Sequence, residues 1–147
     1  MILSLRLAVL YSFLMNIAIR YLSKLGHTKD IAVAIGEALN IPAVSILDEP
    51  SLSEQVDILF LGGAPYANTM DGRLREYAES LNKESVGKVI LFTTSNWSRR
   101  TVRALKKTLT ENGIQVESSF FYAHMLRIEK GKLRAKRWAN EIMKKQA

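Results

Sequence analysis

Short apolar runs of strand length alternate with stretches of helical periodicity along most of this 147-residue sequence. This alternation is typical of a parallel sheet whose strands are joined by helices, because each crossover between parallel strands needs a long connection. The runs with the length and composition of buried strands are residues 16–22, 42–47, 56–63, 87–94 and 114–122. The fold class is therefore predicted to be α/β.

Apolar residues at helical spacing predict the connecting helices. The predicted helices are residues 28–39, 71–81, 98–111 and 132–145. Residues 48–55, between the second and third strands, are too few for a long helix and are expected to form a turn or a single helical turn. Right-handed crossovers then give a doubly wound, five-stranded parallel sheet of order 2-1-3-4-5, with helices on both faces.

Ligands of such sheets bind beyond the carboxyl ends of the strands, near the point where the strand order reverses. The loops over residues 22–28, 63–71 and 94–100 lie at this edge of the predicted sheet. These three loops are therefore where a binding site is expected.

The first fourteen residues are apolar, with a single arginine. A membrane-spanning helix needs about 20 such residues, and a signal peptide needs a small-residue cleavage site that is missing here. Met15 begins a sequence that resembles a natural protein start. Residues 1–14 are therefore interpreted as an upstream extension, such as a misassigned start would produce, and residues 15–147 as one domain. A short membrane-associating segment is the alternative interpretation.

The sequence contains no cysteine, which excludes disulfides, thiol catalysis and iron–sulfur ligation and agrees with a cytoplasmic location. The two histidines, His27 and His124, lie far apart, and no cluster of histidines and carboxylates has metal-ligand spacing. We expect no metal site. No set of nucleophile, base and acid can be placed either, so no catalytic residue is predicted.

The net charge of +7 is unevenly distributed. Residues 1–98 hold 8 basic and 10 acidic side chains, whereas residues 99–147 hold 13 basic and 4 acidic ones. Such a basic segment is interpreted first as a set of solvated helix faces, and an anionic partner is the alternative.

The loop before the first helix has the chemistry of a phosphate site. The N–H groups and the dipole of a helix N-terminus favour an anion, two hydroxyl side chains lie in the loop, and a glycine permits close approach of the backbone. The residues of this candidate site are Ser23, Lys24, Leu25, Gly26, His27 and Thr28. The alternative is an ordinary helix cap by Ser23 or Thr28, with nothing bound.

This segment resembles the phosphate loop of flavodoxins, in which an aromatic residue, hydroxyl residues, a small residue and an alanine recur at fixed spacing. The positions that match are Tyr21, Ser23, Gly26, Thr28 and Ala32. Arg20 departs from the family pattern, where an aliphatic or aromatic residue is usual. The resemblance extends in element order over residues 15–122 and implies a site for flavin mononucleotide (FMN).

The other two loops agree with this resemblance. The resemblance implies that Tyr66 stacks on one face of the flavin ring and Trp97 covers the other. The flavin contacts that it implies are Pro65, Tyr66, Ala67, Asn68, Thr94, Ser95, Asn96 and Trp97. The alternatives are that Tyr66 packs on the helix at 71–81 and that Trp97 covers the helix at 98–111.

The resemblance thus implies an FMN-binding electron-transfer protein, a carrier rather than an enzyme. Flavodoxins are typically acidic near the flavin, whereas Arg99 and Arg100 follow the third loop here. Positive charge there favours the reduced, anionic cofactor, so we expect a higher reduction potential than that of an acidic flavodoxin. For the same reason the redox partner proteins are expected to present an acidic docking face.

Two other functions remain open at this point. A flavin-dependent NAD(P)H or quinone reductase would share the cofactor. A cofactor-free basic module would bind nucleic acid through residues 99–107 and 127–137, although the sequence shows no aromatic residues interleaved with these charges. Nucleic acid and membrane are therefore not the expected partners. A receiver domain is excluded, because the acidic residues that it needs after the first and third strands are absent.

Overall fold

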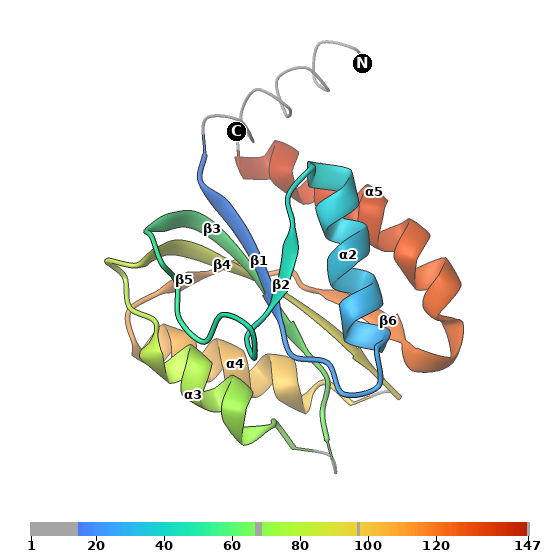
Figure 1. Cartoon of the computed structure of the whole chain (residues 1–147), viewed down its shortest axis with the longest axis horizontal. Coiled ribbons are helices and arrows are strands. Elements are labelled where there is room, and N and C mark those ends of the chain that lie inside the picture. Colours follow the sequence, from blue (N-terminus) through green and yellow to red (C-terminus); the bar gives the residue numbers. More distant parts are fainter. Residues whose placement is uncertain (1–14, 67–68, 97, 147) are drawn as a thin grey trace.

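The computed structural model describes residues 15–66, 69–96 and 98–146. Residues 1–14, interpreted from the sequence as an extension, lie outside this range. The chain forms one parallel sheet covered by helices on both faces (Figure 1). Its strands are β1 (Ile17–Tyr21), β2 (Ala43–Ser45), β3 (Val56–Gly63), β4 (Val86–Ser95), β5 (Gln115–Val116) and β6 (Phe121–His124).

The strand order β2-β1-β3-β4-β5 is the predicted one, and every pairing is parallel. The predicted fifth strand, residues 114–122, is divided into two. β5 pairs with Lys88 and Val89 of β4, and β6 pairs with the last four residues of the same strand. Residues 117–120 between them leave the ladder. The second part ends at His124, two residues beyond the predicted end.

Polar residues explain the division of this edge strand. The N–H of Glu117 still donates to the carbonyl of Val89, at 2.9 Å. The Glu117 carboxylate then binds Lys88 Nζ at 2.6 Å, an ion pair that lowers the pKa of Glu117. Two serines follow, which have little preference for a strand.

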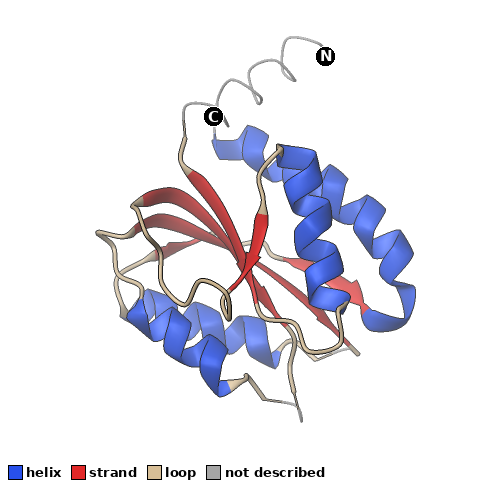
Figure 2. Ribbon diagram, in the orientation of Figure 1, coloured by secondary structure: helices blue, strands red, loops and turns tan. Residues whose placement is uncertain are grey.

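The helices are α2 (His27–Leu39), α3 (Gly72–Ser80), α4 (Arg100–Glu111) and α5 (Ile128–Gln146). Helices α2 and α5 cover one face of the sheet, and α3 and α4 cover the other (Figure 2). As predicted, no long helix joins β2 to β3. None of the helices among the described residues is long and apolar enough to cross a membrane.

Helix α5 begins at Ile128, four residues before the predicted Lys132, and a 3₁₀ turn at Met125–Arg127 precedes it. Close packing explains this earlier start. A Cβ atom at the buried Gly131 would lie 2.9 Å from Ala123 Cβ and 3.4 Å from Ile31 Cδ1. The first turn of α5 therefore lies directly against β6 and α2.

A hydrophobic core lies on each face of the sheet, and the central strand β3 contributes side chains to both. Ile58 and Phe60 face α2 and α5, whereas Leu59 and Leu61 face α3 and α4. This is why the run is apolar throughout. Arg20, the departure from the flavodoxin pattern, lies on the α3 side of β1 and binds Glu49 of the loop between β2 and β3 at 2.9 Å.

Candidate functional site

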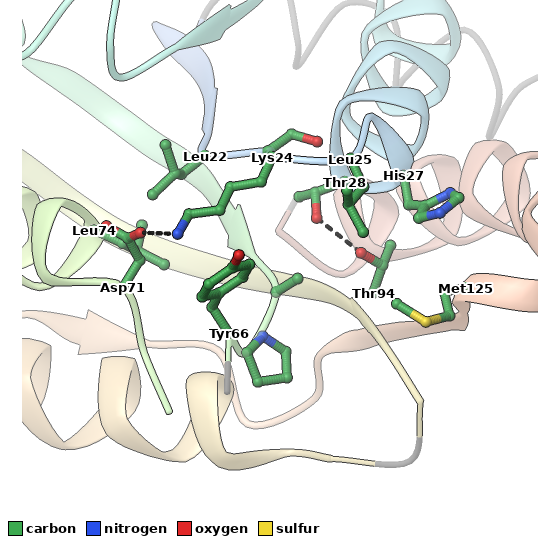
Figure 3. Close-up of a pocket in the computed structure, with 13 residues that line it drawn as sticks. Leu22, Lys24, Leu25, His27, Thr28, Tyr66, Asp71, Leu74, Thr94 and Met125 are labelled. Atoms are coloured by element: carbon green, nitrogen blue, oxygen red, sulfur yellow. Dashed lines mark hydrogen bonds and ion pairs between the residues drawn. The ribbon is translucent and has the colours of Figure 1, made fainter. Parts of the chain in front are cut away.

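Three loops meet at the carboxyl edge of the sheet, around a cavity of about 50 Å³ (Figure 3). They follow β1, β3 and β4, as the topology predicts. The predicted site residues that line this cavity are Ser23, Lys24, Leu25, His27, Thr28, Pro65, Tyr66 and Thr94. The predicted contacts Ala67, Asn68 and Trp97 lie outside the described residues.

The phosphate-loop segment ends in a helix N-terminus that no side chain caps. Gly26 occupies the N-cap position with φ of 95°, a left-handed conformation that favours glycine. No atom lies within 4 Å of a Cβ built there, so conformation rather than crowding calls for glycine. The Gly26 N–H donates to Ser23 Oγ at 3.0 Å, which shapes the loop.

The geometry answers one part of the helix-cap alternative. Neither Ser23 nor Thr28 caps α2, whereas binding of an anion at this loop stays a prediction. The first N–H groups of a helix have no acceptor within the helix itself. Since no side chain supplies one, the N-terminus of α2 can receive an anion.

Thr28 instead ties the first loop to the end of β4. Its side chain is buried, and its hydroxyl shares a 2.7 Å hydrogen bond with the hydroxyl of Thr94 (Figure 3). The neighbouring Ser95 is also buried and donates to the carbonyl of Ser98 at 2.5 Å. Ser95 therefore holds the third loop in shape, and Asn96 is exposed outside the cavity.

Lys24 crosses the cavity from the first loop to the second. Its Nζ lies 3.4 Å from the centroid of the Tyr66 ring and 3.1 Å from Asp71 Oδ2 (Figure 3). The ammonium group thus covers a face of the ring that was predicted to stack on a flavin. Tyr66 is 55% exposed, so a large part of its surface is open to solvent.

Asp71 joins this site although the sequence did not single it out. It caps α3 by accepting the Arg73 N–H at 2.8 Å. The pKa of Asp71 lies well below its usual value. The Arg73 side chain contributes most to this lowering, and the Arg73 N–H and Lys24 contribute less. An aspartate directly before a helix, at the end of a predicted site loop, was a usable signal for this role.

Met125 is a second residue that the sequence did not indicate. It lines the cavity from the 3₁₀ turn after β6. The topology rule points to this turn as well, because β6 is parallel to its neighbour and ends at the same edge of the sheet.

The cavity residues fit the phosphate end of FMN as they stand. They fit the flavin ring only after the Lys24 side chain moves. A phosphate fits the uncapped N-terminus of α2, beside Lys24 and two hydroxyls. The cavity of about 50 Å³ is far below the 300–1,000 Å³ typical of ligand sites. The Lys24 side chain must therefore leave the face of Tyr66 before a ring can stack there. A flexible four-carbon side chain allows this movement.

Comparison with known proteins gives the fold. No protein-family model and no curated protein matches the sequence. A flavodoxin from the domain Archaea superposes with a TM-score of 0.68 at 19% identity, over 89% of this chain and 98% of that one. A Fusobacterium nucleatum flavodoxin bound to flavin mononucleotide gives 0.70 at 16%, with the same coverage of both chains.

A larger protein contains the same unit. The rubredoxin:oxygen oxidoreductase of Desulfovibrio gigas matches with a TM-score of 0.68 at 14% identity, over 87% of this chain and 36% of that one. These structural neighbours confirm the predicted flavodoxin-like fold.

Proposed function

We propose that this chain, whose fold is flavodoxin-like, binds FMN at the carboxyl edge of the sheet and serves as an electron carrier. The observation that carries the proposal is the uncapped N-terminus of α2, which opens beside a cavity shared with Tyr66 and Thr94. Similarity to flavodoxins over 89% of the chain supports it.

The first loop is the proposed phosphate site. The N–H groups at the start of α2 and the hydroxyls of Ser23 and Thr28 would donate hydrogen bonds to phosphate oxygens. Lys24, released from Tyr66, would supply a positive charge to the same group. Thr94 keeps the Thr28 side chain in place through their shared hydrogen bond.

The second loop and the turn after β6 are the proposed ring site. Tyr66 and Pro65 would cover one face of the flavin, while Leu25 and Met125 would exclude water from its edge. Bound FMN would supply the redox chemistry, accepting and giving electrons singly or in pairs. The protein would need only to bind, orient and tune it, which is why we propose a carrier, located in the cytoplasm, that serves redox partner proteins.

Absorption spectroscopy tests the cofactor assignment. The protein is mixed with FMN, desalted and scanned between about 300 and 550 nm, where bound flavin absorbs. Flavin bands that stay with the protein are expected. A Lys24→Glu variant is compared with the wild type and should retain less flavin, because it replaces the positive charge proposed to bind the phosphate by a negative one. A colourless wild-type protein after desalting would contradict the proposal.

A further inference from the structure

A groove outside the candidate cavity follows strand β6, at the edge of the sheet. One part, of about 640 Å³, lies along β6, the segment before it and α5, and is lined by Arg99, Phe120, Arg137 and Trp138 among others. The second part, of about 580 Å³, is lined by residues that include Asn96, His124, Leu126, Arg127 and Lys130. Tyr122 and Arg134 line both parts, so the two adjoin, and together they are named here the edge groove.

The edge groove ends beside the candidate flavin site. Leu126, in its second part, is 81% exposed and follows Met125, which lines the candidate cavity. Asn96 lies two residues after Thr94 of the same cavity. A molecule held along the groove would therefore reach the mouth of the cavity.

The charge of the groove is strongly positive. Its basic side chains are Arg99, Arg127, Lys130, Arg134 and Arg137, against a single carboxylate, Glu141. Among the residues that the structure describes, none of these five forms a salt bridge with a carboxylate. Their charges therefore remain available to an outside anion.

Aromatic rings hold two of the arginines in position. The guanidinium carbon of Arg99 lies 5.7 Å from the Phe120 ring centroid and 5.5 Å from that of Tyr122. The guanidinium carbon of Arg134 lies 5.2 Å from the Phe121 centroid. Stacking on a ring orients a guanidinium without neutralising it, so its N–H fork can still bind a carboxylate in bidentate fashion.

A side chain of α5 occupies part of the free edge of β6, where a further strand could otherwise pair. Arg134 Nη2 donates to the Tyr122 carbonyl at 3.3 Å, and a charged side chain over an edge strand disfavours addition of another strand. The groove is therefore built to recognise charged side chains rather than a peptide backbone.

The same contacts disfavour nucleic acid. The sequence shows no aromatic residues interleaved with its basic ones, but the fold brings Phe120, Tyr122 and Trp138 among the arginines. Single-strand binders stack bases on open ring faces. Here arginines lie over Phe120 and Tyr122, and Trp138 packs on Phe121 at 5.4 Å between centroids.

We propose that the edge groove binds an extended acidic segment of a partner protein. Carboxylates of that segment would pair with Arg99, Arg134 and Arg137, and the bound partner would lie next to the candidate cavity. The redox nature of the partner rests on the proposed function, whereas the binding itself does not require a flavin.

Fluorescence anisotropy tests the groove, with a fluorescein-labelled peptide of about ten residues that alternates glutamate and serine. The variant Arg134→Glu/Arg137→Glu is compared with Arg75→Glu/Lys83→Glu, which changes the net charge equally. Arg75 and Lys83 are exposed near α3 and line neither part of the groove. We expect the groove variant to raise the Kd of the peptide by about tenfold or more, and the control to raise it by less than about twofold.

Three outcomes would overturn the proposal: no peptide binding by the wild type, equal weakening in both variants, or tighter groove-dependent binding of an oligothymidylate of equal charge. The last would assign the groove to nucleic acid. FMN retention is measured on the same samples. A protein that binds the peptide through the groove but retains no FMN would support the groove and contradict only the proposed function.

Discussion

At the scale of single residues, Gly26 shows what a motif position requires. The sequence assigned this glycine to close approach of the backbone, whereas the structure shows a left-handed conformation with open space around it. The pattern thus predicted the residue type, and the left-handed conformation is a second physical reason for it, which the pattern did not indicate.

We expect Gly26→Ala to lower the free energy of unfolding by about 1–2 kcal/mol, because an alanine is strained at this φ. Urea unfolding measures the effect. The control is Gly72→Ala in the first turn of α3, where a Cβ also meets open space but φ is not positive. There we expect a gain of about 0.4–1 kcal/mol. Equal losses in the two variants would refute the conformational explanation.

The buried hydroxyl pair of Thr28 and Thr94 gives a second prediction. Thr28→Val removes one partner and leaves the other hydroxyl buried, which costs about 1–3 kcal/mol. Thr28→Val/Thr94→Val should cost less than the sum of the two single changes, because no buried hydroxyl is left unpaired. Thermal or urea unfolding of all four proteins completes the cycle, and strictly additive losses would contradict the coupling.

At the scale of elements, most of the fold could be predicted from local patterns. The apolar runs located the central strands, and the short segment 48–55 correctly predicted that no long helix joins β2 to β3. The division of the last strand and the early start of α5 could not be predicted. They depend on the Lys88–Glu117 ion pair and on the packing of Gly131 against Ala123, which are contacts between distant segments.

For the candidate site, too, contacts between separate segments could not be predicted from the sequence. The topology rule located the loops, and eight of the predicted residues line one cavity. The position of Lys24 over Tyr66 could not be predicted, because a lysine side chain has many conformers and its partner lies on another loop.

Asp71, the N-cap of α3, makes the stability of the fold depend on pH in the acid range. The pKa of Asp71 is lowered in the folded protein, so the unfolded chain binds a proton first as the pH falls. Asp71 therefore stabilises the fold above about pH 4 and loses this contribution as the pH drops further. In Asp71→Asn, which keeps the capping oxygen, we expect a flatter decline of the melting temperature between about pH 5 and 2. An identical decline in both proteins would exclude this carboxylate as a cause.

At the scale of the whole molecule, the net charge of +7 is concentrated in the residues after 98. Arg99 stacks in the edge groove rather than in the candidate cavity, so its effect on a bound flavin would act through space. We expect Arg99→Glu/Arg100→Glu to lower the reduction potential of the FMN-loaded protein, with a smaller difference at high salt. Redox titration at two salt concentrations measures this, and unchanged potentials would contradict it.

The divided edge strand also has a consequence for local opening. β5 and β6 pair with separate stretches of β4, and residues 117–120 between them are outside the ladder. Breaking the hydrogen bonds of one short strand therefore leaves those of the other intact. Amide hydrogen exchange should show β6 exchanging independently of β5, at a lower opening free energy than β3 in the centre of the sheet. The mouth of the candidate site would then be bordered by a strand that opens more readily than the centre of the sheet.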